Sequence, residues 1–297
     1  MRNKFVRFAL AFFAIFTMTI TGVMANTLEK AKTTGKFTLA YRESSIPFSY
    51  LGEDGKPLGF GWEMCKLIAE EVKKQTGRKD LVVESQAVTS QNRIPLIQNG
   101  TVDVECGSTT NNSERGKQVT FAINYFYTGT RFLVKADSGI KSINDLKGKK
   151  VVSTTGTTNY QILRNLNDEK KYGFELLGAK DHADALLMVE SGMAHAFGMD
   201  DILLYGLKAS SKESAKLAVV GESIQVEPYA IMFRKDDPQF QALVNKVITN
   251  SMKSGEFEKA YKKWFQTNIP PKNVNLNAPM SKELKDNLKN LSDKPAL

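Results

Sequence analysis

The chain has 297 residues, of which 41% are hydrophobic and 25% are charged. This length fits about two domains, and the composition excludes a wholly disordered chain, collagen and a disulfide-dense miniprotein. The sequence contains 41 basic and 32 acidic residues, which give a formal net charge of +9. The basic residues form no long run, so the charge by itself indicates no particular partner.

The first 25 residues have the pattern of an export signal. Arg2, Lys4 and Arg7 precede an apolar run at 8–20, and the segment at 23–25 offers a small-residue cleavage site. We therefore expect cleavage near Ala25 and a periplasmic mature protein. The alternative is an uncleaved N-terminal anchor, although the apolar run is shorter than the roughly 20 residues of a membrane span.

Apolar periodicity predicts strands and helices that alternate along the rest of the chain. Strands are expected at 37–41, 81–84, 102–106, 150–153, 174–177, 194–198, 217–220 and 229–233. Helices are expected from Gly59 onward and at 92–99, 158–165, 183–191 and 238–251. An aromatic stripe predicts one more buried helix: Phe257, Tyr261, Trp264 and Phe265. This alternation is typical of α/β layers with largely parallel sheets.

The two cysteines leave two interpretations open. An oxidising compartment permits a disulfide between Cys65 and Cys106. However, Cys65 falls on an apolar helix face and Cys106 ends a predicted strand, so both are equally compatible with small buried side chains.

Motifs of the common enzyme classes are absent from the sequence. The chain has no GxGxxG after a strand, no P-loop and no GxSxG, HExxH or CxxC motif. Its two histidines, His182 and His195, have no metal-ligand spacing, and it has no basic helix or RNP-like aromatic strand. These absences predict no catalytic residue, no cofactor, no metal site and no nucleic-acid partner.

Polar loops follow several of the predicted strands. They lie at 42–47, 89–94, 107–115, 155–158 and 200–201. Together they supply arginines, helix N-termini and a carboxylate. Because ligands of open α/β sheets bind at the C-terminal ends of the strands, we expect a ligand site there.

Five segments of the chain resemble one protein family. They are RESSIPFSY (42–50), TSQNRIPLIQNGTVDVECGSTTNNSERGKQ (89–118), SGIKSINDLKGKKV (138–151), AKDHADAL (179–186) and RKDDPQF (234–240). From about residue 38 to residue 271, the chain resembles the periplasmic polar-amino-acid-binding proteins of ABC importers, which form solute-binding protein family 3. Within this family it looks most similar to the glutamate/aspartate-binding members.

The resemblance implies an α/β, two-lobed periplasmic-binding-protein fold of type II, with the ligand in the cleft between the lobes. Lobe one is expected at 26–125 and 229–297, and lobe two at 130–226. Two crossings, at 126–129 and 227–228, are expected to form the hinge.

The resemblance also assigns the groups that hold the backbone of an amino acid. Arg115 matches the arginine that clamps the α-carboxylate, with help from Thr110 and the backbone near Ser108. Asp200 matches the aspartate that pairs with the α-ammonium. A turn before a helix of lobe two matches further donors to the carboxylate: Gly156, Thr157 and Thr158.

The pocket for the ligand side chain selects among amino acids. The resemblance brings Arg42, Ser90 and Arg93 together and places His182 opposite them. Two cationic groups and a hydroxyl complement a second carboxylate, repel a cationic side chain and leave excess charge beside a neutral amide. The pocket therefore favours an acidic amino acid, but it does not rank glutamate and aspartate, which differ by one methylene. His182 also opens a predicted helix, so a capping or solvent-facing role is its alternative.

Taken together, these features predict a monomeric binding protein that captures glutamate or aspartate and delivers it to the membrane permease of an ABC importer. One alternative is an exported enzyme of the same fold, similar to cyclohexadienyl dehydratases. Such an enzyme needs an acid or base without a structural partner, and strand alternation turns Glu43 away from the proposed cleft, which leaves Glu105 near it. The other alternative is a binding protein for a neutral polar amino acid such as glutamine. A chemoreceptor-binding or adhesive role also stays open.

Overall fold

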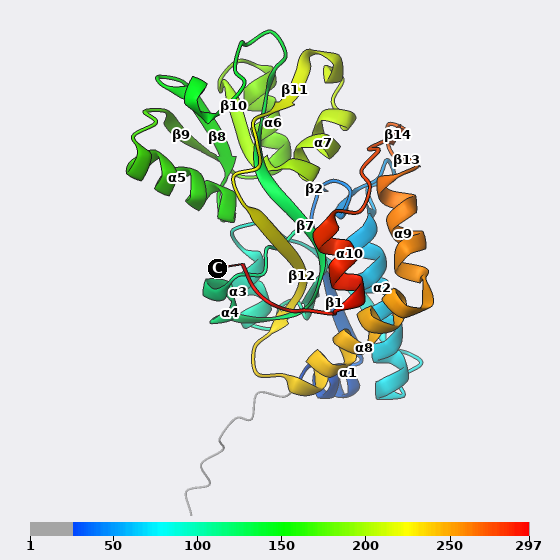
Figure 1. Cartoon of the computed structure of the whole chain (residues 1–297). Helices are drawn as coiled ribbons and strands as arrows, with labels where there is room; N and C mark the ends of the chain where they lie inside the picture. The colour runs from blue at the N-terminus through cyan, green and yellow to red at the C-terminus, as the bar shows by residue number, and fades with distance from the viewer. Residues whose placement is uncertain (1–25, 297) are drawn as a thin grey trace, which may run out of the picture.

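The computed structural model describes residues 26–296 (Figure 1). The predicted export signal at residues 1–25 lies outside the described residues. Within 26–296, none of the helices combines the length and the apolar character that crossing a membrane requires. Figure 1 shows two bodies of strands and helices, joined by the long strands β7 (Val119–Lys135) and β12 (Val226–Arg234).

One body, which we call lobe 1, is built on three parallel strands. β1 (Lys36–Tyr41) lies between β5 (Val82–Ala87) and β6 (Val104–Glu105). Phe37 and Leu39 of β1 are buried between the strand layer and its helices. The helices of lobe 1 are α1 (Thr27–Thr34), α2 (Phe60–Thr76), α3 (Arg93–Gln98), α4 (Ser113–Gly116), α8 (Pro238–Ser254), α9 (Glu256–Phe265) and α10 (Lys282–Lys289).

The second body, lobe 2, repeats this arrangement. β8 (Lys150–Thr154) lies between β9 (Glu175–Ala179) and β10 (Ala196–Asp200), and both pairings are parallel. Two helices of this lobe begin shortly after a strand ends. Thr157 and Asp181 are their N-caps, because the side chains of these residues accept hydrogen bonds from backbone N–H groups of the first turn. The helices of lobe 2 are α5 (Thr158–Lys170), α6 (His182–Glu190) and α7 (Asp201–Ser210).

The two long strands continue the sheet from one lobe into the other. The first half of β7 pairs with β12, and its second half pairs with β10 and with β11 (Leu217–Val220), always antiparallel. The strand order is β5-β1-β6-β12-β7-β10-β8-β9. The sequence analysis predicted the parallel strands of each lobe but not β7. Most of β7 is buried on both faces, so it lacks the apolar–polar alternation that reveals a half-exposed strand.

The predicted crossings lie where β7 and β12 pair between the lobes. Phe126 pairs with Tyr229 and Gly129 pairs with Val226, and the register shifts next to Tyr229. The two crossings are therefore paired segments of β7 and β12 rather than separate loops. Bending at 126–129 and 227–228 stays a prediction.

Aromatic side chains fill much of the core of lobe 1. The predicted aromatic stripe forms α9, which buries Phe257, Tyr261, Trp264 and Phe265. The ring centroids of Tyr261 and Phe265 lie 4.3 Å apart, and Phe126 of β7 stacks on Phe265 at 5.1 Å. This stacking packs α9 against β7, a strand that crosses between the lobes.

A disulfide joins Cys65 of α2 to Cys106, the residue that follows β6. The pair left open by the sequence is thus bonded, and it ties α2 to the start of the polar loop at 107–115.

The C-terminal segment returns to lobe 1 beyond α10. The carbonyl oxygen of Ser292 accepts a hydrogen bond from the backbone N–H of Asn124 at 2.9 Å, and Ala296 forms a bridge with Asn112. The remaining elements are short: β2 (Ser44–Ser45), β3 (Ser49–Leu51), β4 (Pro57–Leu58), β13 (Asn268–Ile269), β14 (Val274–Asn275) and two 3₁₀ turns (Ile143–Leu146 and Ser214–Lys216).

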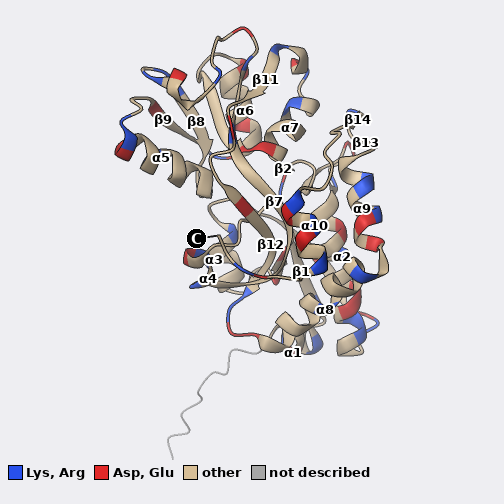
Figure 2. Cartoon of the chain, in the orientation of Figure 1, with Lys and Arg blue, Asp and Glu red and all other residues tan. Residues whose placement is uncertain are grey.

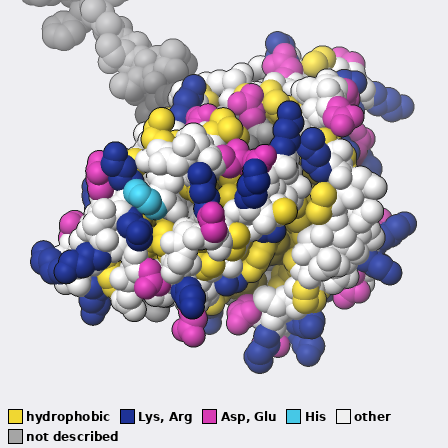
Figure 3. All heavy atoms as spheres, turned by 90° about the horizontal axis from the view of Figure 1, so that it is seen from above, with side chains coloured by type: hydrophobic (Ala, Val, Ile, Leu, Met, Phe, Trp, Pro, Cys, Tyr) yellow, Lys and Arg dark blue, Asp and Glu magenta, His cyan; other side chains and the backbone are white. Residues whose placement is uncertain are grey.

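Charged residues lie mainly in the helices and loops, whereas the central strands contain few (Figure 2). Figure 3 views the molecule from above and shows basic and acidic side chains interspersed over that face. On this face, neither sign of charge forms a patch of its own.

Candidate functional site

A narrow cavity lies between the lobes, and its side chains leave almost no free space in this closed form. The ligand residues predicted from the sequence line it, except Arg42 and Gly156, and two further residues join them. The lining residues are Ser90, Arg93, Ser108, Thr110 and Arg115 from lobe 1, and Thr157, Thr158, Asn159, His182, Met199 and Asp200 from lobe 2. The cavity therefore has one wall from each lobe.

Arg115 reaches from one wall to the other. It lies on α4, whose N-cap Asn112 accepts a hydrogen bond from the backbone N–H of Arg115 at 2.9 Å. One guanidinium nitrogen donates to the carbonyl oxygen of Thr110 in lobe 1 at 2.9 Å. Another donates to the carbonyl oxygen of Gly156 in lobe 2 at 3.2 Å. Burial lowers the pKa of Arg115, and the neighbouring Glu227 opposes this effect.

The two lobes are in direct contact around the cavity. Gly156 has a φ of +78°, and a Cβ atom at this position would lie 2.7 Å from the backbone nitrogen of Gln91 in lobe 1. Ser44 of lobe 1 donates a hydrogen bond to the carboxylate of Asp181 in lobe 2. The structure is thus a closed form, in which a glycine is required where the two backbones approach.

Arg42 lies behind the cavity wall rather than in it. Its Nη2 donates to the Ser90 hydroxyl at 3.0 Å and lies 3.4 Å from Nε2 of His182. Since a guanidinium only donates, Nε2 of His182 is the acceptor, and the His182 proton is on Nδ1, which lies 2.8 Å from the Thr154 hydroxyl. Burial and the charge of Arg42 lower the pKa of His182 to about 3, so this histidine is neutral.

His182 therefore has neither of the alternative roles considered from the sequence. Asp181 is the N-cap of α6, and His182 is only 1% exposed. It faces Arg42 across the cleft, as the resemblance implied, but as a neutral acceptor that orients the guanidinium. The exposed Glu43 points away from the cleft, also as expected.

Arg93 supplies a buried charge directly in the cavity wall. It begins α3, is 2% exposed, and has a pKa that burial holds well below its usual range, with a further lowering by Arg115 and Arg42. Its Nε and Nη1 atoms have no hydrogen-bond partner among the described residues, and the same holds for Nε and Nη1 of Arg42.

The three buried arginines lack a carboxylate partner. None of the ion pairs within residues 26–296 involves Arg42, Arg93 or Arg115. Acids near these arginines include Glu105, Asp200 and Glu227, but none of them forms an ion pair with the arginines, and Oε2 of Glu105 accepts from the Thr109 hydroxyl at 2.6 Å instead. Buried cations without paired anions are costly, so this cluster is suited to a ligand that brings negative charge.

Asp200 presents the opposite charge from lobe 2. Its Oδ1 accepts from Nδ2 of Asn159 at 2.9 Å, and its Oδ2 accepts from the Tyr229 hydroxyl. Both partners are neutral. Burial and the nearby Glu227 raise the pKa of Asp200 to about 8. A cation beside this carboxylate would stabilise its ionised form.

Sequence reasoning missed Asn159, Tyr229 and Glu227. Asn159 directly follows the predicted turn at 156–158, so the first turn of α5 was a signal that could have found it. Glu227 lies at the predicted crossing and Tyr229 directly follows it, but only the structure shows that they form hydrogen bonds with the lining residues Thr110 and Asp200.

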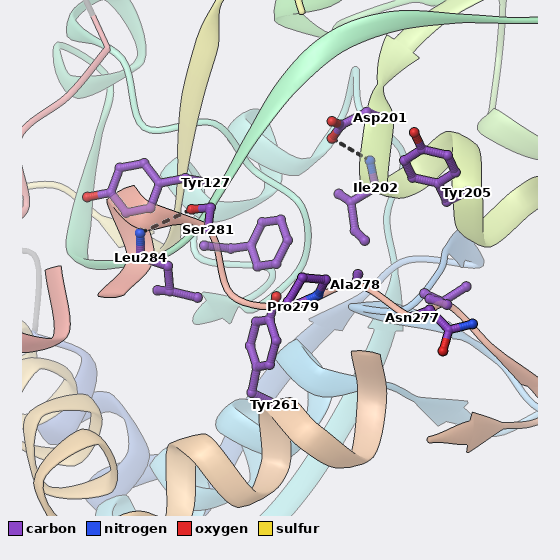
Figure 4. A pocket seen from close by; sticks show the side chains of 12 residues that line it. Tyr127, Asp201, Ile202, Tyr205, Tyr261, Asn277, Ala278, Pro279, Ser281 and Leu284 are labelled. Carbon is purple, nitrogen blue, oxygen red and sulfur yellow. Dashed lines mark hydrogen bonds between the residues drawn. The ribbon is translucent and has the colours of Figure 1, made fainter. Parts of the chain in front are cut away.

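A second hollow of the molecule fits an acidic amino acid less well. This hollow lies between β7, α7, α9 and the segment at 276–284 (Figure 4). It is lined by aromatic residues such as Tyr127, Tyr205 and Tyr261, and Asp201 is the one charged residue among its lining residues. It therefore lacks the pair of opposite charges found in the cleft. Within 26–296, no group of three or more His, Cys, Asp or Glu side chains is placed to hold a metal ion.

Comparison with known sequences identifies the family. The family model of bacterial extracellular solute-binding proteins, family 3, matches residues 37–267. The chain is similar to the L-glutamate/L-aspartate-binding protein of Pseudomonas aeruginosa, with 50% identity over 92% of this chain and 91% of that protein. It is also similar to the glutamate/aspartate import solute-binding protein of Escherichia coli, with 46% identity over 91% of this chain and 89% of that protein.

Comparison with solved structures confirms the predicted two-lobed α/β fold. The crystal structure of a mutant of ArgBP from T. maritima matches with a TM-score of 0.71 and 25% identity, over 81% of this chain and 99% of that chain. The sequence match and the fold agree. The chain belongs to the bacterial extracellular solute-binding proteins of family 3.

Proposed function

We propose that this protein captures L-glutamate or L-aspartate outside the cytoplasmic membrane and delivers it to the membrane permease of an ABC importer. One observation carries the proposal: a closed cavity joins buried arginines that have no carboxylate partner to a buried carboxylate that has no cationic partner among the described residues. An acidic amino acid supplies two carboxylates and one ammonium, which complement this set.

The α-carboxylate subsite is formed by Arg115 and the N-terminus of α5. A guanidinium binds a carboxylate through charge-assisted hydrogen bonds, and the N-terminus of α5, with its cap Thr157, favours an anion. Asp200 is the partner of the α-ammonium. The carboxylate subsite therefore takes groups from both walls, whereas Asp200 belongs to the wall of lobe 2.

The second carboxylate binds at Arg93 and Ser90, with Arg42 behind them. The unpaired Nε and Nη1 of Arg93 are the strongest available donors in this part of the wall. A neutral amide leaves this charge uncompensated, and a cationic side chain is repelled by it, so glutamine and arginine fit less well. The names of the relatives from Pseudomonas aeruginosa and Escherichia coli support the same ligand class.

The protein acts by binding rather than by catalysis. Both acids near the proposed ammonium are held by hydrogen bonds from the protein: two to Asp200, and three to Glu227 from Thr110, Thr158 and Gln225. Neither is a free acid or base for proton transfer. Export through residues 1–25, a monomeric state and the permease partner are parts of this proposal, and membership in an extracellular family supports export.

Closure of the lobes accompanies binding, with β7 and β12 as the hinge. A ligand that contacts both walls favours the closed state, because its affinity differs between the open and closed forms. Small-angle scattering should show a smaller radius of gyration with saturating glutamate than without it. An unchanged profile would contradict the hinge but not the binding site.

A thermal-shift screen of the twenty amino acids tests the proposed ligand class. We expect glutamate and aspartate to raise the unfolding temperature, because a ligand that binds only the folded state stabilises it. Recovery of the unchanged amino acid after incubation would show binding without turnover. Stabilisation by glutamine or arginine but by neither acid would contradict the proposal, and so would the absence of any shift with glutamate and aspartate.

A further inference from the structure

Glu227 lies on a strand that crosses between the lobes, and its carboxylate contacts residues of both lobes. It lies on β12, opposite Thr128 of β7, in the ladder that crosses between the lobes. Its side chain is buried, with 1% exposure. One carboxylate oxygen, Oε2, accepts from the hydroxyl of Thr110 at 2.9 Å and from the hydroxyl of Thr158 at 2.8 Å. Oε1 accepts from Nε2 of Gln225 at 2.7 Å.

The two threonines come from opposite walls of the cavity. Thr110 lies in the polar loop of lobe 1, and Thr158 is the first residue of α5 in lobe 2. Their hydroxyl oxygens are 3.2 Å apart. In this closed form, Glu227 therefore accepts a hydrogen bond from one hydroxyl of each lobe.

The direction of these hydrogen bonds fixes the chemistry that the hydroxyls offer to a ligand. A hydroxyl has one proton and two lone pairs, so a hydroxyl that donates to Glu227 can only accept on its other side. Both threonines line the cavity. Each therefore presents a lone pair to an ammonium and has no proton left for a carboxylate.

We propose that Glu227 is a positioning residue for the ligand ammonium, acting through the hydroxyls of Thr110 and Thr158. It makes the floor of the cavity an acceptor-only surface, and it couples that surface to lobe closure. This inference rests on the proposed function and adds to it, because it assigns to the crossing strand a part in selecting amino acids over dicarboxylates that lack an ammonium. The roles expected from the sequence for the hydroxyls of Thr110 and Thr158 change accordingly, from donors to the carboxylate to acceptors from the ammonium.

The negative charge of Glu227 also favours an ammonium over a carboxylate in this part of the cavity. It is the largest electrostatic contribution that raises the pKa of Arg115, and it contributes to the raised pKa of Asp200. Glu227 thus partly neutralises the carboxylate clamp while it adds negative charge beside Asp200. Removal of this charge should strengthen the binding of a carboxylate and weaken the binding of an ammonium.

A comparison of glutamate with glutarate, its analogue without the ammonium, tests this role. Calorimetry or competition should show that E227Q lowers the ratio of glutamate affinity to glutarate affinity at least about tenfold, because one ion-assisted contact is lost. Glu222→Gln is the matched control, since Glu222 is exposed and precedes the same strand, and it should leave the ratio unchanged. A purely structural role for Glu227 would lower both affinities equally and leave the ratio unchanged, which would overturn the inference.

Thr158→Val keeps the test decisive if E227Q does not fold. A hydroxyl that accepts from the ammonium is needed for glutamate alone, so T158V should also lower the ratio. A hydroxyl that donates to a carboxylate would be needed equally for both ligands, and an unchanged ratio in T158V would contradict the inference. In the double variant E227Q/T158V, the two effects should be less than additive, because both substitutions remove the same contact.

The same experiment separates the inference from the proposed function. If the wild-type protein binds glutamate and the variants keep its ratio of glutamate affinity to glutarate affinity, only the role of Glu227 is contradicted. Wild-type protein that binds no glutamate would overturn both.

Discussion

The two walls of the cleft differ in charge and in what they lack. Lobe 1 contributes Arg93 and Arg115, with Arg42 behind them, and none of these forms an ion pair with a described carboxylate. Lobe 2 contributes the Asp200 carboxylate, the neutral His182 and the N-terminus of α5. Each wall alone complements only part of an acidic amino acid. The difference between the walls explains why a ligand of mixed charge should draw them together.

The largest expected loss of glutamate affinity comes from substitution of Arg115 in the wall of lobe 1. Arg115→Ala should weaken glutamate binding by about 2–5 kcal/mol, because a desolvated carboxylate loses its charged donor. Calorimetry measures the loss. Arg164→Ala is the matched control, since Arg164 is exposed on α5 and should not affect binding. Normal glutamate affinity in Arg115→Ala would show that the α-carboxylate lies elsewhere.

A second substitution pair separates the two other arginines of lobe 1. Arg93→Gln should cost about 1.5–3 kcal/mol of glutamate binding and should reduce the preference for glutamate over glutamine, because Arg93 lines the cavity. Arg42→Gln should cost less, because Arg42 contacts Ser90 and His182 behind the wall. Calorimetry with both amino acids gives the two ratios. A larger loss in Arg42→Gln than in Arg93→Gln would reverse the assignment.

This pair also shows where sequence reasoning reached its limit. The resemblance correctly brought Arg42 and Arg93 to the same region, but the sequence does not give the direction of a side chain. Only the structure shows that Ser90 and His182 lie between Arg42 and the cavity. The role of Glu227 was hidden for a related reason, since it depends on the pairing of β12 with β7.

The fold was predictable to the extent that its elements carry a clear pattern. The strands and helices of both lobes follow apolar periodicity, and the aromatic stripe at 257–265 packs as a buried helix. β7 was not predicted, because a strand buried on both faces has no alternation to detect. The disulfide was not decidable from the sequence either, because the separation of Cys65 and Cys106 in space depends on how α2 packs against β6.

The wall of lobe 2 should impose a pH dependence on the ligand-free protein. Between pH 6.5 and 8, the unfolded chain has Asp200 ionised, whereas the folded closed form retains its proton because the pKa is raised to about 8. The folded state then binds more protons, so the free energy of unfolding should fall as pH rises, by at most about 1.4 kcal/mol per pH unit. His182 contributes a slope of the opposite sign near pH 6.5, where the unfolded chain still partly protonates it, so the slope from Asp200 is best measured above about pH 7.5.

Denaturant titrations of the ligand-free protein at several pH values measure this slope. Asp200→Asn should flatten it, while Asp184→Asn, at an exposed position on α6, should leave it intact. An equal slope in wild type and Asp200→Asn would show that Asp200 is ionised throughout and that its burial is relieved by opening of the cleft.

The most direct test of the charged-wall account is the ratio of glutamate affinity to glutamine affinity in the wild-type protein. Calorimetry at fixed pH and salt measures it for two ligands of nearly equal size that differ in one charge. The account predicts that glutamate binds at least about tenfold more tightly, because the amide leaves the guanidinium of Arg93 without a negative partner. Equal affinities, or a preference for glutamine, would contradict it.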